Sequence, residues 1–360
     1  MKKQGIYQTD LGIGNGWIHF GSKDGEPFSQ LSFIDIGDMN NDCIKTELDG
    51  NQIIITVMLN NMPSSIQIDT ETEKGVFDVF SIGFHKELEL QLISDIPAFD
   101  NHHIVVPEKN IHELQAHQDY ISEQVENKLQ FTLSDPEVLS YAKKHGIDVE
   151  NHYDIKSCLA IMDKLCYTIQ QDGVNYTHDK QNCGTIAQME YAFQHNHHTN
   201  CRGLALILAG ILRAYGYRAS AVECRPLSGD VHVVCEVYLE DLKKWVMMDP
   251  TNDLVYYQNT TPLSLIELRE AMINHAELSL NENANRNGKE LDIMSLLAFM
   301  SNKMFYFVKT IDSCEDKTIT NDNAITNDNA ICLTSKELMN EECEWKITTN
   351  NIAAYYQKLF

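Results

Sequence analysis

A chain of 360 residues has room for two domains of ordinary size, and its 43% apolar content is typical of a globular protein. Its 28 basic and 52 acidic residues give a formal net charge of −24, which argues against a surface for nucleic acid or anionic membranes. No apolar run reaches the roughly 18 residues of a membrane-spanning helix, and no secretory signal follows Met1. The ten cysteines form no C-x-x-C pair, so we expect reduced thiols in a cytoplasmic protein.

The first third of the chain has the pattern of a β domain. Residues 52–59 (QIIITVML) predict a buried strand, and shorter strands are expected over 65–69 and 77–84. Leu88, Leu90 and Leu92 then alternate with polar residues, as in a half-buried strand. Short strands separated by turn residues are typical of a small sandwich, so we expect a β-sandwich-like domain over residues 1–118.

The chain becomes helical after this domain. Asp135 followed by Pro136 marks a helix start, and Gly146 marks its end. Apolar residues at helical spacing from Ile155 to Ile169 predict an amphipathic helix. Residues 179–198 are polar and show no clear period, and we expect them to lead the chain to the mouth of an active site.

A stronger helix signal begins at residue 201. Thr199 and Asn200 are good N-cap residues, apolar residues follow at helical spacing, and Gly216 stands where a left-handed cap ends many helices. Cys201 therefore lies in the first turn. The helix dipole and unpaired N–H groups at that position favour thiolate over thiol, which suits a nucleophile. Taken alone, Cys201 would be better explained as a buried helix cysteine, and it is the later His232 and Asp249 that favour catalysis.

Three strands are expected after this helix, over residues 217–224, 231–239 and 245–249, the last two as an antiparallel hairpin. If Leu239 pairs with Lys244, Val234 lies opposite Asp249 and shares a face with His232. His232 and Asp249 would then lie on one face, at roughly 5–8 Å between Cβ atoms. A carboxylate there can bind one imidazole nitrogen and leave the other for a thiol, whereas a one-residue slip would separate the pair.

Several motifs in this region resemble those of the transglutaminase-like superfamily. The resemblance rests on Cys201-Arg-Gly-Leu-Ala205, Leu212 to Ala219, the His232 strand and Trp245 to Thr251, with a looser likeness in Pro262 to Arg269. It implies a papain-like site with Cys201 as nucleophile, His232 as base and Asp249 as orienting acid. One departure is that Thr199-Asn200 precedes the nucleophile, where the family usually has an aromatic residue or glycine.

Other side chains near the nucleophile have alternative interpretations. Gln194 or Asn196 can supply an oxyanion donor upstream of Cys201, or belong to a solvated loop. Glu236 shares the His232 face, so it either lines the cleft or is an exposed strand residue. The His195-x-His197-His198 cluster with Cys201 raises the possibility of zinc, but adjacent histidines rarely bind one ion and no second half-site follows. We therefore expect no metal and no cofactor.

The remainder is expected to form a helical and mixed extension. A helix should begin near Ser264, residues 281–288 form a polar break, and residues 293–308 predict another apolar helix. The hexapeptide ITNDNA occurs twice in tandem over 319–330, which we interpret as a loop extension rather than a calcium site. Residues 344–360 should add a strand and a short helix.

Together these observations predict an α+β protein with a β-sandwich-like domain (1–118), a papain-like transglutaminase core (119–275) and a C-terminal extension (276–360). The expected chemistry is cysteine-dependent cleavage of a peptide or protein amide through a thioester. Hydrolysis is favoured over transfer to an amine because water needs no second binding site. The alternative to an enzyme is a non-catalytic binding or scaffold module in which Cys201, His232 and Asp249 are kept only for packing.

Overall fold

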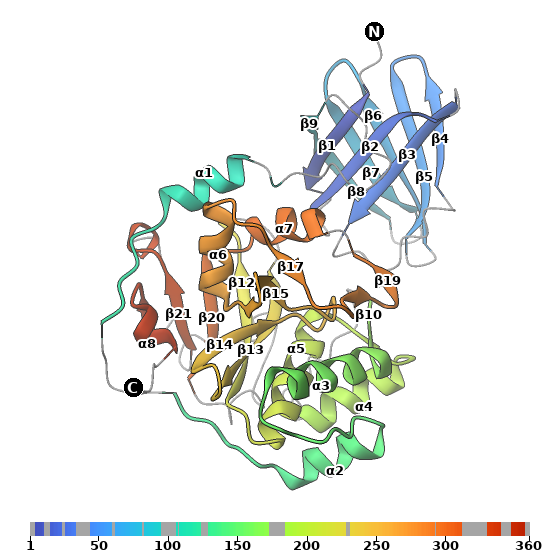
Figure 1. The fold of residues 1–360 in the computed structure, drawn as a ribbon. Coiled ribbons are helices and arrows are strands. Elements are labelled where there is room, and N and C mark those ends of the chain that lie inside the picture. The colour runs from blue at the N-terminus through green and yellow to red at the C-terminus, as the bar shows by residue number, and fades with distance from the viewer. Residues whose placement is uncertain are drawn as a thin grey trace. The chain divides into compact units, whose positions relative to one another are not determined.

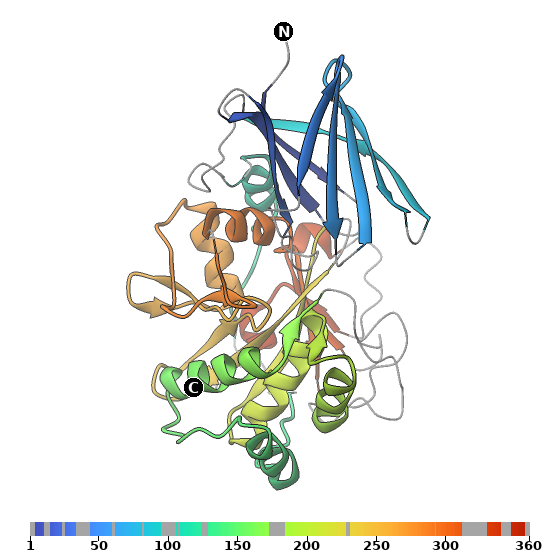
Figure 2. The same cartoon turned by 90° about the vertical axis from the view of Figure 1, so that its right-hand side faces the viewer.

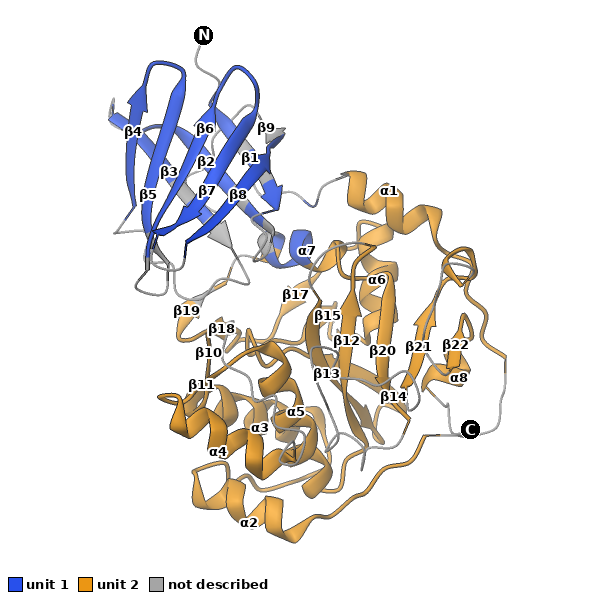
Figure 3. Cartoon of the chain, turned by 180° about the vertical axis from the view of Figure 1, so that it is seen from behind, with its two compact units in different colours: residues 1–107, 294–299 blue, residues 108–293, 300–360 orange. Residues whose placement is uncertain are grey.

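The computed structural model describes residues 4–10, 15–23, 26–33, 44–59, 62–80, 83–94, 106, 108–123, 129–172, 184–227, 231–291, 293–311, 330–339 and 347–356 (Figure 1). The chain divides into two compact units, one of residues 1–107 with 294–299 and one of residues 108–293 with 300–360 (Figure 3). The mixture of helices and several sheets confirms the α+β class. None of the helices in the described ranges is long and apolar enough to span a membrane.

The first unit consists mainly of two antiparallel sheets, with the strand orders β3-β2-β1-β9 and β4-β5-β6-β7-β8. The strands are β1 (Gly5–Asp10), β2 (Asn15–Lys23), β3 (Glu26–Phe33), β4 (Lys45–Asp49), β5 (Gln52–Leu59), β6 (Met62–Asp69), β7 (Lys74–Val79), β8 (Phe84–Glu89) and β9 (Gln91–Ser94). Alternate residues of β5 point inward, and one buried cluster joins side chains such as Tyr7 and Ile18 of the first sheet to Ile55 and Phe77 of the second. This shared core makes the unit a sandwich, as the sequence predicts.

One strand boundary differs from the prediction. The single strand expected over 77–84 is wrong, because β7 ends at Val79 and β8 begins at Phe84. Gly83 lies just before β8 with a φ of +65°, a conformation that glycine adopts without a steric penalty. The chain therefore turns where the apolar run seemed to continue.

The second unit is built on a six-stranded sheet of order β14-β13-β12-β20-β21-β22. Its strands are β12 (Ala219–Arg225), β13 (His232–Leu239), β14 (Lys244–Met248), β20 (Tyr306–Thr310), β21 (Ala330–Thr334) and β22 (Ile347–Thr349). Neighbouring strands are antiparallel except for β21 and β22. All eight residues of β13 are buried, as expected for a strand covered on both faces.

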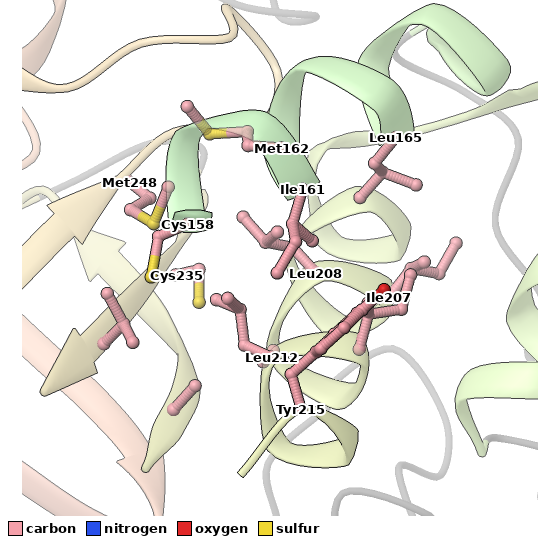
Figure 4. Close-up of a cluster of buried hydrophobic side chains, with 14 of the residues drawn as sticks. Cys158, Ile161, Met162, Leu165, Ile207, Leu208, Leu212, Tyr215, Cys235 and Met248 are labelled. Carbon is pink, nitrogen blue, oxygen red and sulfur yellow. The ribbon is translucent and has the colours of Figure 1, made fainter. Parts of the chain in front are cut away.

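Helix α5 packs on one face of this sheet, with three further helices around it (Figures 1 and 2). The central helix α5 spans Cys201–Ala214, and the three helices around it are α2 (Pro136–Lys144), α3 (Ile155–Thr168) and α4 (Thr185–Gln194). Figure 4 shows Ile161 of α3 and Leu208 of α5 directed into the same cluster as Cys235 of β13. Asp135 caps α2 by accepting from two backbone N–H groups, and Pro136 opens it, as the sequence predicts.

The opposite face of the sheet carries a second layer. Helices α6 (Leu265–Ile273) and α8 (Ile352–Tyr356) belong to it, and the indole Nε1–H of Trp245 donates to the carbonyl of Tyr356 at 2.8 Å. The remaining elements of the described residues are α1 (Glu108–Ala116), α7 (Ile293–Ser301), a 3-10 turn (Lys336–Leu338), β10 (Gln170–Gln171), β11 (His198–Thr199), β15 (Tyr256–Gln258), β16 (Thr261–Pro262), β17 (Ser279–Leu280), β18 (Asn285–Arg286) and β19 (Lys289–Glu290).

In the C-terminal third, two predicted elements differ from the structure, and a predicted strand and helix are confirmed. The helix expected over 293–308 ends at Ser301, because Tyr306–Thr310 enters the sheet as β20. The polar break expected over 281–288 includes β18 and runs into its hairpin with β19. The strand and helix expected within 344–360 are present as β22 and α8. All of the tandem hexapeptide except Ala330 lies outside the described residues.

Candidate active site

Cys201 is the first residue of α5, as predicted. The side chain of Asn200 caps the helix by accepting a hydrogen bond from Gly203 N at 3.0 Å. The thiol is partly buried and packs against a small apolar cluster that includes Ala205 and Val233. Cys201 therefore combines partial exposure with a place at the positive end of a buried 14-residue helix.

His232 begins β13, and Asp249 directly follows β14. The two strands pair in the register that brings these residues together, with Leu239 opposite Lys244 and Cys235 opposite Met248. His232 Nε2 donates to Asp249 Oδ2 at 3.0 Å, and the two side chains are only 1% and 2% exposed. This bond leaves Nδ1 as the ring nitrogen available to a thiol.

A tight turn fixes the carboxylate of Asp249. The backbone N–H of Asp249 donates to the carbonyl of Leu254 at 2.9 Å. Its Oδ1 accepts from Thr251 N at 3.0 Å, and its Oδ2 also accepts from Asn252 Nδ2 at 2.9 Å. Three donors on one buried carboxylate favour its charged form and hold its orientation. Asn252 was not predicted as a site residue, although its position three residues after Asp249 and two after Pro250 is a recognisable turn signal.

The electrostatics of the pair favour an imidazolium beside a carboxylate. Burial alone would lower the pKa of His232, but the charge of Asp249 and hydrogen bonds to Asp249 and Cys201 outweigh it and raise the pKa to about 10. Burial would raise the pKa of Asp249, but His232 and the Asn252 and Thr251 donors lower it overall. His232 is therefore charged at neutral pH and interacts with both other side chains of the site.

Two predicted oxyanion residues lie on the surface, and one predicted cleft residue is buried. Gln194 ends α4 and is exposed, as is Asn196, which adopts a φ of +54°. Glu236 is fully buried, so it is neither an exposed strand residue nor part of an open cleft. Its Oε1 accepts from Leu265 N at 3.0 Å and from the Tyr356 hydroxyl at 2.9 Å, because α6 and α8 cover this face of the sheet.

The histidine cluster does not form a metal site. The Nδ1 atoms of His195, His197 and His198 contact three different backbone carbonyls, at 2.8, 3.1 and 2.7 Å. Among the residues that the structure describes, no three His, Cys, Asp or Glu side chains are grouped to hold an ion. The zinc alternative therefore has no ligand set in the described ranges.

Comparisons with known proteins found one family model and one solved structure that are similar to parts of this chain. No curated protein matches the chain. A crystal structure of a proposed cysteine protease from Cytophaga hutchinsonii is similar at 15% identity and a TM-score of 0.26, covering 68% of this chain and 80% of that one. The family model described as the transglutaminase-like superfamily matches residues 142–250, a range that includes Cys201, His232 and Asp249. The chain thus contains a transglutaminase-like domain over residues 142–250.

Proposed function

We propose that this protein is a cysteine amidase or peptidase that acts through Cys201, His232 and Asp249. The observation that carries the proposal is the placement of His232 between a buried carboxylate at 3.0 Å and the thiol at the start of α5. A thiol becomes an effective nucleophile when an adjacent imidazole accepts its proton and a third group orients that imidazole.

The reaction follows from these roles. The Cys201 thiolate attacks the amide carbonyl carbon, and the carbonyl electron pair moves to oxygen. When that oxygen re-forms the double bond, the C–N bond breaks and the His232 imidazolium gives its proton to the departing amine. The product is a thioester on Cys201. Asp249 holds the imidazole in place throughout and stabilises its charged form.

The thioester then passes to an acceptor. We favour water, because it needs no second binding site: His232 takes a proton from water, the hydroxide adds to the carbonyl, and the carboxylic acid leaves as the thiolate re-forms. An amine acceptor would instead give acyl transfer by the same steps. The substrate class that this chemistry fits is a peptide or protein amide.

The pH dependence of Cys201 alkylation by iodoacetamide tests the proposal. Peptide mapping by mass spectrometry separates Cys201 from the other cysteines, and His232→Ala removes the proposed base. At pH 6, we expect the His232→Ala variant to react at least about tenfold more slowly, since an isolated thiol with a pKa near 8.5 is almost fully protonated there. His197→Ala is the matched control, because His197 is exposed and bonded elsewhere.

Equal reactivity of Cys201 in wild type and His232→Ala would contradict the proposal and favour a non-catalytic binding module. If the difference is found, peptide libraries incubated with and without an added primary amine distinguish hydrolysis from transfer. Release of a free acid in both conditions indicates hydrolysis, whereas incorporation of the amine indicates acyl transfer.

A further inference from the structure

A short parallel strand lies beside the residues that lead into Cys201. β10 pairs with β11 in a register that places Gln170 opposite His198 and Gln171 opposite Thr199. Gln170 N donates to the carbonyl of His197 at 2.8 Å, and Asp172 N to that of Thr199 at 3.1 Å. The sequence shows no sign of this pairing, which joins segments about 28 residues apart.

The register defines which glutamine faces α5. Thr199 lies against the first turn of the helix, since a Cβ atom placed on Gly203 would be 2.1 Å from Thr199 Oγ1. Opposed residues of parallel strands project to the same side, and neighbouring strands lie about 4.8 Å apart. Gln171 therefore projects with Thr199 toward the first turn of α5, and Gln170 projects away from it.

The side chain of Gln171 is buried but incompletely bonded. It is 4% exposed, and its Oε1 has no hydrogen-bond partner among the described residues. Buried carboxamides are normally bonded, so an unmet polar end points to a group that arrives with a ligand. A half turn about the last side-chain bond exchanges Oε1 and Nε2, so the same end can present a donor.

We propose that the Gln171 carboxamide and the backbone N–H of Cys201 form the oxyanion site of this enzyme. This inference rests on the proposed function, in which the substrate carbonyl oxygen gains negative charge when the Cys201 thiolate attacks. N–H groups in the first turn of a helix have no intrahelical acceptor, and they favour an anion. A second donor from a fixed side chain then completes the arrangement used to stabilise such oxygens.

The backbone of Gln171 is held from its other side by Asn287. Asn287 Oδ1 accepts from Gln171 N at 3.0 Å, and Asn287 Nδ2 donates to Gln171 O at 2.8 Å. Asn287 and Gly288 form the turn between β18 and β19 with φ values of +51° and +80°, as in a tight hairpin. Asn287 is thus a positioning residue that fixes β10 without touching the substrate.

Two reactions of the same thiol test the assignment. Acylation by p-nitrophenyl acetate passes through a tetrahedral oxyanion, whereas alkylation by iodoacetamide displaces iodide and forms none. We expect Gln171→Met, which keeps the length of the side chain, to slow Cys201 acylation by about 100-fold and to leave alkylation within about twofold. Gln171→Glu should slow acylation at least as much, because a carboxylate repels the oxyanion. Gln170→Ala, from the opposite face of the same strand, is the control and should change neither rate.

The outcomes separate this assignment from the proposed function. If Gln171→Met slows both reactions equally, or leaves acylation unchanged, Gln171 has only a structural role and the oxyanion assignment is wrong. If Cys201→Ala acylates as fast as wild type, the thiol is not the nucleophile and the proposed function itself fails. Asn287→Ala should slow acylation more than alkylation, and an equal effect on the two would refute its positioning role.

Discussion

The chemistry of the site depends on two buried ionisable residues whose charges support each other. Asp249 is charged because His232, Asn252 and Thr251 all donate to it. His232 keeps its proton because Asp249 and Cys201 offset the effect of burial. Burying either charge without its partner would lower the stability of the fold, so removing one residue leaves the other as an uncompensated buried charge.

This coupling predicts a pH-dependent difference in stability between wild type and His232→Gln. The folded pKa of His232, about 10, is above its usual 6.5, so the stabilisation is complete below about pH 6.5 and lost as the pH rises toward 10. We expect wild type to exceed the variant by about 3 kcal/mol in free energy of unfolding at pH 6, and by much less at pH 10. Denaturant unfolding over this range measures it. A difference that stays constant with pH would show that His232 is not charged in the fold.

At the scale of the elements, α5 is closely surrounded by its neighbours. From Gly203 to Ala214 all of its residues are buried, and it approaches α4 closely at Gly210. A Cβ atom at Gly210 would lie 1.8 Å from Thr185 Oγ1 and 2.8 Å from Thr185 Cβ. Glycine at this position therefore serves packing between helices, despite its poor helix propensity.

Gly210→Ala should consequently destabilise the protein. Alanine favours a helix over glycine by about 1 kcal/mol, but we expect the clash with Thr185 to outweigh this and give a net loss of about 1–3 kcal/mol. Thermal or denaturant unfolding measures the change. Adding Thr185→Ala should recover part of it, because the hydroxyl and methyl are the near atoms that can be removed. An increase in stability for Gly210→Ala alone would show that α4 moves freely.

Some elements of the fold can be predicted from local sequence patterns, whereas others depend on partners that are distant in the chain. The signals of α5 and of the β13–β14 hairpin are local, and they were sufficient to place Cys201, His232 and Asp249 correctly in the fold. β10 and β20 were not foreseen, because their partners are distant in the chain and supply most of the reason for the strand conformation. The burial of Glu236 depends on α6 and α8 together, and no local pattern indicates that cover.

At the scale of the whole sheet, a buried lysine and a buried glutamate interact electrostatically beneath aromatic rings. Lys309 Nζ lies 3.9 Å from the ring centre of Tyr355 and 4.7 Å from that of Trp245. Burial lowers the pKa of Lys309 to about 8, against the opposing charge of Glu236, and burial raises the pKa of Glu236. These residues come from β20 and β13, so the pair connects the two halves of the sheet.

The pair predicts opposite results for single and double substitutions. Glu236→Gln keeps an oxygen for Leu265 N but removes the charge that offsets Lys309, so we expect a loss of about 3 kcal/mol. Lys309→Met with Glu236→Gln should recover most of this loss, since an apolar side chain suits the aromatic surroundings. Glu240→Gln is the surface control, with an expected change below about 0.5 kcal/mol. A double variant no more stable than Glu236→Gln would show that Lys309 is stabilising by itself.

The order of strands in the sheet has a consequence for biosynthesis. β12 lies next to β13, yet its other neighbour is β20, which leaves the ribosome about 80 residues later. Until that segment emerges, the strand beside His232 presents an unpaired edge, and the face that α8 covers remains open. A nascent chain that already contains Cys201, His232 and Asp249 therefore still lacks β20, β21, β22 and α8, and we expect the surroundings of His232 to be complete only after these elements have been synthesised.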